Sequence, residues 1–452
     1  EAHEIIFVDN GSTDDTLKWL QGQARENKSY QLIENKSNIG QVKGRNQGIN
    51  LSKGEFIVLM DNDVVVSEGW LSGMRECLSQ APLCGIIGAM TNNSDGMQKA
   101  TDESYQTVNY LDKYAAQYKE RFRHRRIHCR NLDGFCMFFK RTLAENIGLF
   151  DKRFDTGQCE DEDFCIRAAL AGYSNYIAGD VFLHCESKKA PGNRIPLEDK
   201  WTLTMGNPEG KKLALLKAIE YANLLHSKGE IDQAVEALVN CIKFAPDTKE
   251  IYYELARIFI ESKKFPEAWE VIGTMPEEAK NSIKGLEWAG YTKEGMGLND
   301  EAMGFADRIL SLDSANPSAL NLKGILAFKK DQIEEAQNYF KQAIQSDPGF
   351  GEPYTNLGIL YWKMDKKNKA LASLRKGFIL SPNVPDNCSI YYSALTTAEE
   401  FSQAEDDFAE ANRLYPSHKN IAFLYIDILI RQGKLDDAML KIEDALNSFG
   451  LD

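Results

Sequence analysis

The second half of the chain repeats itself with a fixed period, and this feature constrains the fold more than any other. An alanine recurs every 34 residues, at Ala234, Ala268, Ala302, Ala336, Ala370, Ala404 and Ala438. A regular period of this length means that one supersecondary unit is copied and stacked on its neighbours. We therefore expect an extended solenoid here, in which each unit contacts mainly the next.

The residues around these alanines indicate what each unit is. Twelve residues before each alanine the side chain is mostly small, and four residues after it is mostly larger and apolar. The first set is Ala222, Ala256, Gly290, Gly324, Gly358, Tyr392 and Ile426, and the second is Leu238, Ile272, Ala306, Phe340, Leu374, Phe408 and Ile442. Prolines follow four of the alanines by twelve residues, at Pro246, Pro348, Pro382 and Pro416. Since proline stops a helix, the unit is predicted to be helix, turn, helix.

This pattern resembles the tetratricopeptide repeat, as in Gly358-Ile359-Leu360-Tyr361 and Ala336-Gln337-Asn338-Tyr339-Phe340. The resemblance covers residues 211–452 with about seven repeats, although Ser314 and Lys280 stand where a proline is usual. It implies an all-α solenoid with a concave surface that binds a protein or peptide. The alternative is an array that only dimerises the rest of the molecule.

The first half alternates short apolar runs with helical patterns. The runs EIIFVDN, YQLIEN and FIVLMDNDVVV predict strands, and residues 16–26 predict a helix between the first two. Such alternation is typical of an α/β sheet, whose ligands gather at the carboxyl ends of the strands. We take residues 1–205 as this domain.

Acidic side chains stand at two of these strand ends. Asp9 closes the first run, and Asp61 and Asp63 follow the apolar residues 56–60. Two neighbouring carboxylates repel each other unless a cation lies between them. A hard divalent ion, Mg²⁺ or Mn²⁺, would suit these oxygen ligands.

Residues 38–48 contain three glycines and two cations at the start of a helix. Exposed N–H groups at a helix start, with Arg45 nearby, suit a diphosphate. The alternative is a flexible loop with a solvated arginine.

Four acids, Glu160 to Asp163, open another helix. The helix dipole explains one or two of them, and the surplus indicates a general base near a bound hydroxyl. His184 follows a strand-like run and is either a structural histidine or a ligand.

Five segments in this order resemble the large family of inverting GT-A glycosyltransferases that use nucleotide-diphospho-sugars: VDNGSTDDT, NIGQVKGRNQGI, GEFIVLMDNDV, LDGFCMFFKRTLAENIGLFD and CEDEDFCIRAALAGY. The resemblance covers residues 4–190 and implies a nucleotide-sugar-binding, Rossmann-like mixed sheet. By position, the resemblance implies that the nucleotide-sugar is bound by Asp9, Asn10, Gly40, Arg45, Asn46, Asp61 and Asn62. It implies that the metal is held by Asp61, Asp63 and His184. It also implies that Asp161 is the catalytic base and that Glu160 supports it.

Composition narrows the remaining possibilities. The 53 basic and 67 acidic residues give a net charge of −14, which argues against nucleic acid as a partner. No apolar stretch reaches the length of a membrane span, so membrane association would be peripheral only. The basic run at 119–130 is interpreted as a solvated helix face, with contact to an acceptor or to anionic lipid as alternatives. Nine cysteines without a CxxC pair indicate buried thiols in the cytoplasm.

The sequence thus predicts a metal-dependent inverting glycosyltransferase that moves a sugar from a nucleotide-diphospho-sugar to a hydroxyl, on a protein recruited by the repeats. One alternative is synthesis of a polysaccharide or lipid-linked glycan, with the repeats recruiting an assembly partner. Another is a non-catalytic scaffold. Because Glu1 lies within an apparent strand, we expect the natural N-terminus upstream.

Overall fold

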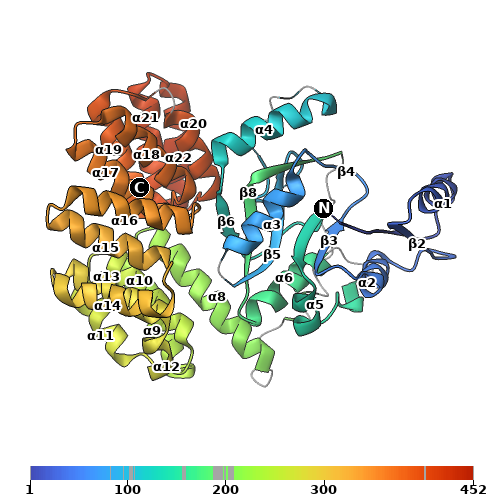
Figure 1. The fold of residues 1–452 in the computed structure, drawn as a ribbon, viewed down its shortest axis with the longest axis horizontal. Helices are drawn as coiled ribbons and strands as arrows, with labels where there is room; N and C mark the ends of the chain where they lie inside the picture. Colours follow the sequence, from blue (N-terminus) through green and yellow to red (C-terminus); the bar gives the residue numbers. More distant parts are fainter. Residues whose placement is uncertain are drawn as a thin grey trace. The chain divides into compact units, whose positions relative to one another are not determined.

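The structure is a computed structural model in which the chain divides into two compact units, Glu1–Leu213 and Ala214–Asp452. It describes residues 2–81, 83–94, 96–100, 105, 107–154, 159–186, 197, 200–201, 208–401 and 404–450. Each unit has its own buried clusters. The helices and strands of both units are labelled in Figure 1.

The first unit is a mixed α/β domain. Strands β1 (Ile5–Asp9) and β2 (Tyr30–Glu34) form a parallel pair, joined by helix α1 (Thr16–Glu26). The larger sheet has the order β3-β7-β5-β8-β4, with β6 also paired to β8. Its strands are β3 (Phe56–Met60), β4 (Val64–Val65), β5 (Cys84–Thr91), β6 (Arg126–Cys129), β7 (Cys136–Lys140) and β8 (Ser174–Cys185). Within this larger sheet only β5 and β8 are paired in parallel, so its described strands form the mixed sheet that the sequence predicted.

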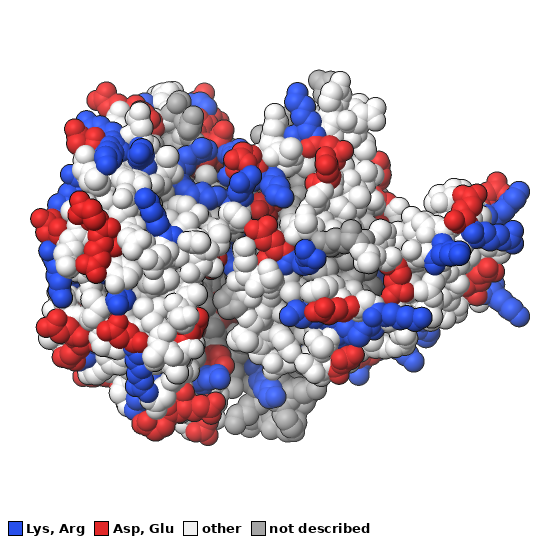
Figure 2. Space-filling model, viewed as in Figure 1, with Lys and Arg blue, Asp and Glu red and all other residues white. Residues whose placement is uncertain are grey.

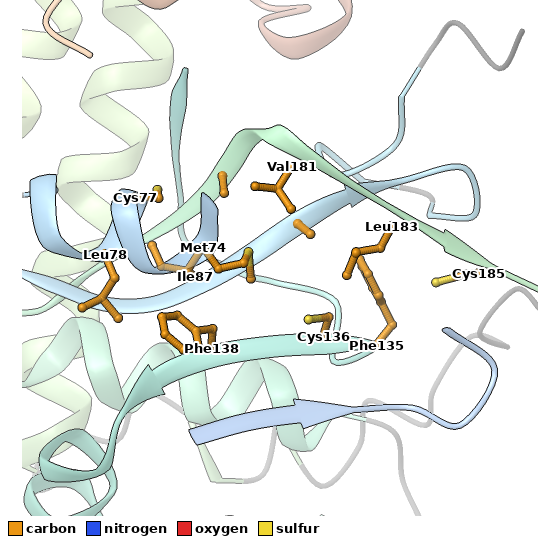
Figure 3. Packing of buried hydrophobic residues seen from close by; sticks show 12 residues of the cluster. Met74, Cys77, Leu78, Ile87, Phe135, Cys136, Phe138, Val181, Leu183 and Cys185 are labelled. Atoms are coloured by element: carbon orange, nitrogen blue, oxygen red, sulfur yellow. The ribbon is translucent and has the colours of Figure 1, made fainter. Parts of the chain in front are cut away.

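Helices cover both faces of this sheet. Besides α1, the described helices of the unit are α2 (Gln41–Leu51), α3 (Trp70–Gln80), α4 (Leu111–Phe122), α5 (Arg141–Ile147) and α6 (Glu160–Leu170), with short 3-10 turns at Val108–Tyr110 and Lys152–Phe154. On one face Met74 and Leu78 of α3 pack against Ile87 and Phe138 (Figure 3). On the other, Phe164 of α6 packs on Phe139 with ring centroids 5.3 Å apart. Neighbouring residues of β7 thus point to opposite faces, as strand geometry requires.

The second unit is a stack of helix pairs. Its helices are α8 (Pro208–Ser227), α9 (Ile231–Phe244), α10 (Lys249–Glu261), α11 (Phe265–Thr274), α12 (Glu277–Asn281), α13 (Ile283–Gly295), α14 (Asn299–Leu312), α15 (Pro317–Lys329), α16 (Ile333–Ser346), α17 (Glu352–Lys363), α18 (Lys367–Leu380), α19 (Pro385–Ala398), α20 (Ala404–Leu414), α21 (Lys419–Arg431) and α22 (Leu435–Phe449). Each repeat consists of two antiparallel helices, and the extra short helix α12 lies between the second and third repeats. Lys and Arg alternate with Asp and Glu over the face of this unit in Figure 2.

The packing confirms the interpretation of the periodic positions. All seven repeat alanines lie in second helices, and their exposed fractions are at most 2%. A Cβ on Gly324 would lie 2.5 Å from the Phe340 ring, and one on Gly358 would lie 2.6 Å from Leu374. The small residue of each pair therefore makes room for the large one.

The basic run at 119–130 departs from the expected solvated helix face. It begins in α4, which ends at Phe122, and finishes in strand β6. Between them Arg125 is only 3% exposed, lies 3.8 Å from the centroid of the Phe122 ring, and donates to the Tyr118 hydroxyl. The cation–π contact with Phe122 stabilises Arg125 in this buried position.

None of the described helices is long and apolar enough to cross a membrane.

Candidate functional site

The first predicted strand end presents a constrained acid. The Oδ2 atom of Asp9 accepts hydrogen bonds from the backbone N–H groups of Gly11 and Ser12, at 3.1 and 3.2 Å. Asp9 is 3% exposed, and its Oδ1 atom has no hydrogen-bond partner among the described residues. A buried acceptor without a donor is costly, so this oxygen is suited to a donor group of a ligand.

Asn10 and Gly40 lie side by side next to Asp9. The Asn10 amide donates to the Gly40 carbonyl at 3.1 Å, and its oxygen accepts from Asn35 at 2.9 Å. Gly40 has φ 95°, a conformation that favours glycine, and directly precedes helix α2. The structure thus brings together two predicted residues from distant segments.

Arg45 links two acidic segments that the sequence analysis treated as separate. Its Nη2 atom lies 2.7 Å from Oδ1 of Asp61, and its Nη1 atom lies 3.0 Å from Oε1 of Glu160. Nη2 also donates to the carbonyl of Gly134 at 3.1 Å. The side chain of Arg45 is 10% exposed and that of Glu160 is 1% exposed. Burial makes these charge-assisted contacts stronger than surface pairs.

Asp161 is fixed at the same place by backbone groups. Its Oδ2 atom accepts from the Gly134 N–H at 2.9 Å, and its Oδ1 atom accepts from the Glu162 N–H at 2.9 Å. A Cβ on Gly134 would lie 2.9 Å from the same Oδ2 atom and 3.3 Å from Nη1 of Arg45. Gly134 was not predicted as a site residue. The Asp133-Gly134 dipeptide in the quoted segment LDGF was the available signal.

The remaining predicted residues of this region have other contacts. Asn46 is 5% exposed and forms two hydrogen bonds with the backbone of Phe150, at 2.8 and 3.0 Å. Its amide therefore fixes the backbone at Phe150. Asn62 lies exposed in the turn between β3 and β4. Asp163 is fully buried and is held by Arg167, Lys200 and the Trp201 indole, each within 3.0 Å. These three partners were also missed, because nothing in local spacing connects residue 200 with α6.

The predicted metal ligands lie around the ends of β3, β4 and β8. Val65 pairs with His184, and the carbonyl of Asp63 accepts from the Glu186 N–H at 3.0 Å. Burial, together with the nearby charges of Asp63 and Asp61, raises the pKa of the Cys185 thiol to about 11. Both carboxylates are therefore close to the end of β8.

These ligands do not form a complete metal cage. Nδ1 of His184 lies 2.5 Å from the Tyr105 hydroxyl, and Nε2 lies 3.6 Å from Oε1 of Glu186. Within the described part of the chain, no three His, Cys, Asp or Glu side chains are arranged to hold a metal ion. Two carboxylates are nevertheless a donor set suited to Mg²⁺, which often takes its other ligands from substrate phosphates and water.

Models of different families match the first and the second part of the chain. The family model for glycosyl transferase family 2 matches residues 1–148. Two models for tetratricopeptide repeats match residues 317–350, 351–383 and 393–449.

Curated proteins and solved structures resemble separate parts of the chain. BBSome complex member BBS4 of Bos taurus is 23% identical over 217 residues, which are 48% of this chain and 42% of the relative. Polypeptide N-acetylgalactosaminyltransferase 11 of Xenopus tropicalis is 35% identical over 91 residues, 19% of this chain and 15% of the relative. A thermophilic TPR protein of Thermus thermophilus aligns with a TM-score of 0.35 and 20% identity, covering 40% of this chain and 100% of that structure. The chain spans less than half the length of these two curated relatives.

Proposed function

Since the chain carries a glycosyl transferase family 2 domain followed by tetratricopeptide repeats, we propose that it transfers a sugar from a nucleotide-diphospho-sugar to a hydroxyl group, with inversion at the anomeric carbon. The observation that carries this proposal is the cluster around Arg45, which joins Asp61 to Glu160 and adjoins Asp161 through Gly134. This cluster supports the proposal because it connects the acid proposed for the donor side with the segment that carries the proposed base.

In the proposed reaction, Asp161 accepts the proton of the attacking hydroxyl. The hydroxyl oxygen forms a bond to the anomeric carbon from the face opposite the diphosphate, while the bond from that carbon to the diphosphate oxygen breaks. The diphosphate leaves with the electron pair. The two backbone N–H bonds to Asp161 hold its carboxylate in one orientation, which general base catalysis requires.

Asp9, Asn10 and Gly40 are proposed to hold the nucleoside end of the donor. The Oδ1 atom of Asp9, for which the described residues provide no hydrogen-bond donor, supplies a buried acceptor for an N–H or hydroxyl of the nucleoside. Arg45 is proposed to contact the diphosphate, which would compete with Asp61 for its Nη2 atom.

We propose Asp61 and Asp63 as the ligands of Mg²⁺ or Mn²⁺, with His184 beside them. A bound divalent ion would neutralise the charge that develops on the departing diphosphate. Asp63→Asn is expected to lower turnover, and addition of Mn²⁺ should restore the activity of chelator-treated wild-type protein. Undiminished activity in excess chelator would exclude the metal.

The role of Asp161 is tested by Asp161→Asn, with Glu162→Gln as the matched control. Both substitutions remove one acid from the first turn of α6, so they weaken its favourable dipole interaction equally. Asp161→Asn is expected to lower turnover about a hundredfold or more, with nucleotide binding by calorimetry unchanged. Glu162→Gln should stay near wild type. Equal turnover in the two variants would reject the base assignment.

We propose a protein acceptor recruited by the repeats, since a tethered binding surface raises the local concentration of acceptor sites. The full chain and residues 1–213 are to be compared on a protein acceptor and on a short glycoside. Loss of transfer to the protein alone supports recruitment. Equal loss on both acceptors, or none, favours polysaccharide or lipid-linked glycan synthesis. The nine cysteines are all free thiols, which fits the cytoplasm as the proposed compartment.

A further inference from the structure

Asp133 has no role in the reaction described above, yet the chain places it between two acids that do. It directly precedes Gly134, whose N–H donates to Oδ2 of the proposed base Asp161 at 2.9 Å. One residue further on, the carbonyl of Phe135 accepts from the N–H of Asp61 at 2.9 Å. This short segment therefore runs between the proposed base and the first acid of the proposed metal pair.

The charge of Asp133 acts at the same end of the sheet. The pKa of the Cys185 thiol is raised mainly by burial, and the charges of Asp63, Asp61 and Asp133 raise it as well. Phe135 and Cys185 also lie at one end of the sheet in Figure 3. Among the residues that the structure describes, no three side chains are arranged as metal ligands. A role outside the metal site is therefore more consistent with the position of Asp133.

A buried polar network holds Asp133 in place. Ser94 Oγ donates to Oδ2 of Asp133 at 2.5 Å, and the N–H of Asp133 donates to Oε1 of Gln98 at 2.7 Å. Ser94 is 5% exposed and Gln98 is 3% exposed. Gln98 in turn donates to the Ala89 carbonyl of β5 at 2.9 Å. Asp133 itself stays partly exposed, so its carboxylate is oriented by buried partners and is still accessible to a ligand.

The proposed reaction fixes where the transferred sugar lies. Because the hydroxyl attacks from the face opposite the diphosphate, the sugar lies between the proposed base and the proposed metal site. We propose that the carboxylate of Asp133 accepts hydrogen bonds from hydroxyl groups of this sugar and so selects among donor sugars. This inference rests on the proposed function.

The chemistry of a carboxylate suits this role. Its two oxygens can accept from two neighbouring hydroxyls, and such charge-assisted hydrogen bonds are stronger than neutral ones. A sugar whose hydroxyls point elsewhere would leave the acceptor without its donors, which penalises the wrong donor.

The alternative is that Asp133 only anchors the loop that carries Ser94. The two roles differ in their effect on a nucleoside diphosphate, which lacks the transferred sugar. Loss of an anchor would weaken binding of the nucleoside diphosphate and of the complete donor alike. Loss of a sugar contact would weaken binding of the complete donor alone.

The test measures binding to the full chain by calorimetry with Mn²⁺ present. A panel of nucleoside-diphospho-sugars first identifies the donor that wild-type protein binds most tightly. Asp133→Asn should weaken binding of this donor about ten- to hundredfold. Binding of the matching nucleoside diphosphate should not weaken, since removal of a negative charge favours an anion. Glu120→Gln, which removes an exposed acid on α4, is the charge-matched control and should bind both ligands as wild type does.

Fluorinated donors identify the contacted hydroxyl. Fluorine does not donate a hydrogen bond, so one analogue should bind wild type about tenfold more weakly than the parent donor. Asp133→Asn should bind this analogue and the parent donor almost equally, since the contact is already lost. Ser94→Ala keeps the carboxylate and should still distinguish the two. Asp133→Glu, which moves the carboxylate, should change the order of preference in the panel.

The outcomes separate this inference from the proposed function. Equal weakening of donor and nucleoside diphosphate in Asp133→Asn, or donor binding equal to wild type, would overturn the role of Asp133 alone. So would a Ser94→Ala variant that no longer distinguishes the analogue from the parent donor. Wild-type protein that binds none of the nucleotide sugars would reject the proposed function, and the role of Asp133 with it.

Discussion

At the scale of single residues, Arg45 shows how contacts change a role inferred from pattern. The sequence analysis assigned it to a diphosphate, and the structure places it between Asp61 and Glu160, with Gly134 as a third partner. In this arrangement one guanidinium offsets the repulsion between two acids from distant segments. Binding of a diphosphate would redistribute these contacts, so Arg45 connects the donor side of the site with α6.

The sequence identified the acids of the proposed site but not the groups that contact them. Asp61 follows an apolar run and Asp161 opens a helix, and both features are local. The N–H of Gly134 and the amide of Asn46 act through contacts with segments far away in the chain. Such contacts depend on how the sheet and its loops pack, which periodicity does not reveal.

Gly134→Ala tests the support of Asp161. The new Cβ would lie 2.9 Å from Oδ2 of Asp161, so the carboxylate must shift. We expect turnover to fall at least about tenfold, since small displacements of catalytic groups are costly. Gly22→Ala in α1 is the control, because no atom lies within 4 Å of its new Cβ. Wild-type turnover in Gly134→Ala would contradict the orientation argument.

Glu352 gives the second unit a pH-dependent stability. Burial raises the pKa of its carboxyl from 4.5 to about 7, although Lys284 opposes the shift. A raised pKa means that the folded state favours the neutral acid, so this contribution is full below pH 4.5 and is lost as pH rises through about 7.

Glu352→Gln cannot ionise and should escape this loss. In urea unfolding, the free energy of unfolding of the variant should rise relative to that of wild type between pH 4.5 and 7. At pH 8 the difference should be on the order of 1 to 3 kcal/mol. Glu335→Gln, which removes an exposed acid on the preceding helix α16, should follow wild type throughout. A constant difference between Glu352→Gln and wild type would contradict the linkage.

At the scale of elements, the sequence predicted helices and strands correctly where a local feature, such as a proline or an apolar run, determines them. The four prolines of the repeat pattern predicted helix ends, and helices α9, α16, α18 and α20 each end two residues before one of them. Strand β3 spans the predicted apolar run, Phe56–Met60. The prediction of a solvated helix face for residues 119–130 was wrong at Arg125. This residue is buried against Phe122 by tertiary packing, which a count of charges does not capture.

Gly324→Ala tests the small-to-large fit inside a repeat. Alanine has the higher helix propensity, but its Cβ would lie 2.5 Å from the Phe340 ring. Overpacking is expected to dominate and to lower the free energy of unfolding by about 1 to 3 kcal/mol. Phe340→Leu should recover part of that loss when combined with it.

The control for this fit is Gly304→Ala on α14. No atom lies within 4 Å of the Cβ that it would create, so only propensity acts there. Chemical denaturation should show this variant stabilised by roughly 0.5 to 1 kcal/mol. If both alanine variants are stabilised, the fit between Gly324 and Phe340 is looser than the structure indicates.

At the scale of the whole molecule, the sequence placed a change of architecture between residues 205 and 211, and the contacts divide the chain between Leu213 and Ala214. Helix α8 crosses this division, so composition alone could not fix it. The two sides also differ in contact order, since strands of the sheet pair over long separations while repeats contact their neighbours. The two units are therefore expected to respond to different perturbations.

If the two units unfold separately, calorimetry of the full chain should show two unfolding transitions. Because the proposed donor site belongs to the folded first unit, a nucleoside diphosphate with Mn²⁺ at a hundred times its dissociation constant should stabilise that transition by about 2.7 kcal/mol. Gly324→Ala should lower only the other transition, because its clash lies within a single repeat. Asp61→Asn should reduce the ligand-induced shift and leave the Gly324→Ala effect unchanged. If the ligand and Gly324→Ala move the same transition, the two units unfold as one cooperative body, and the separate cores seen in the structure do not act independently.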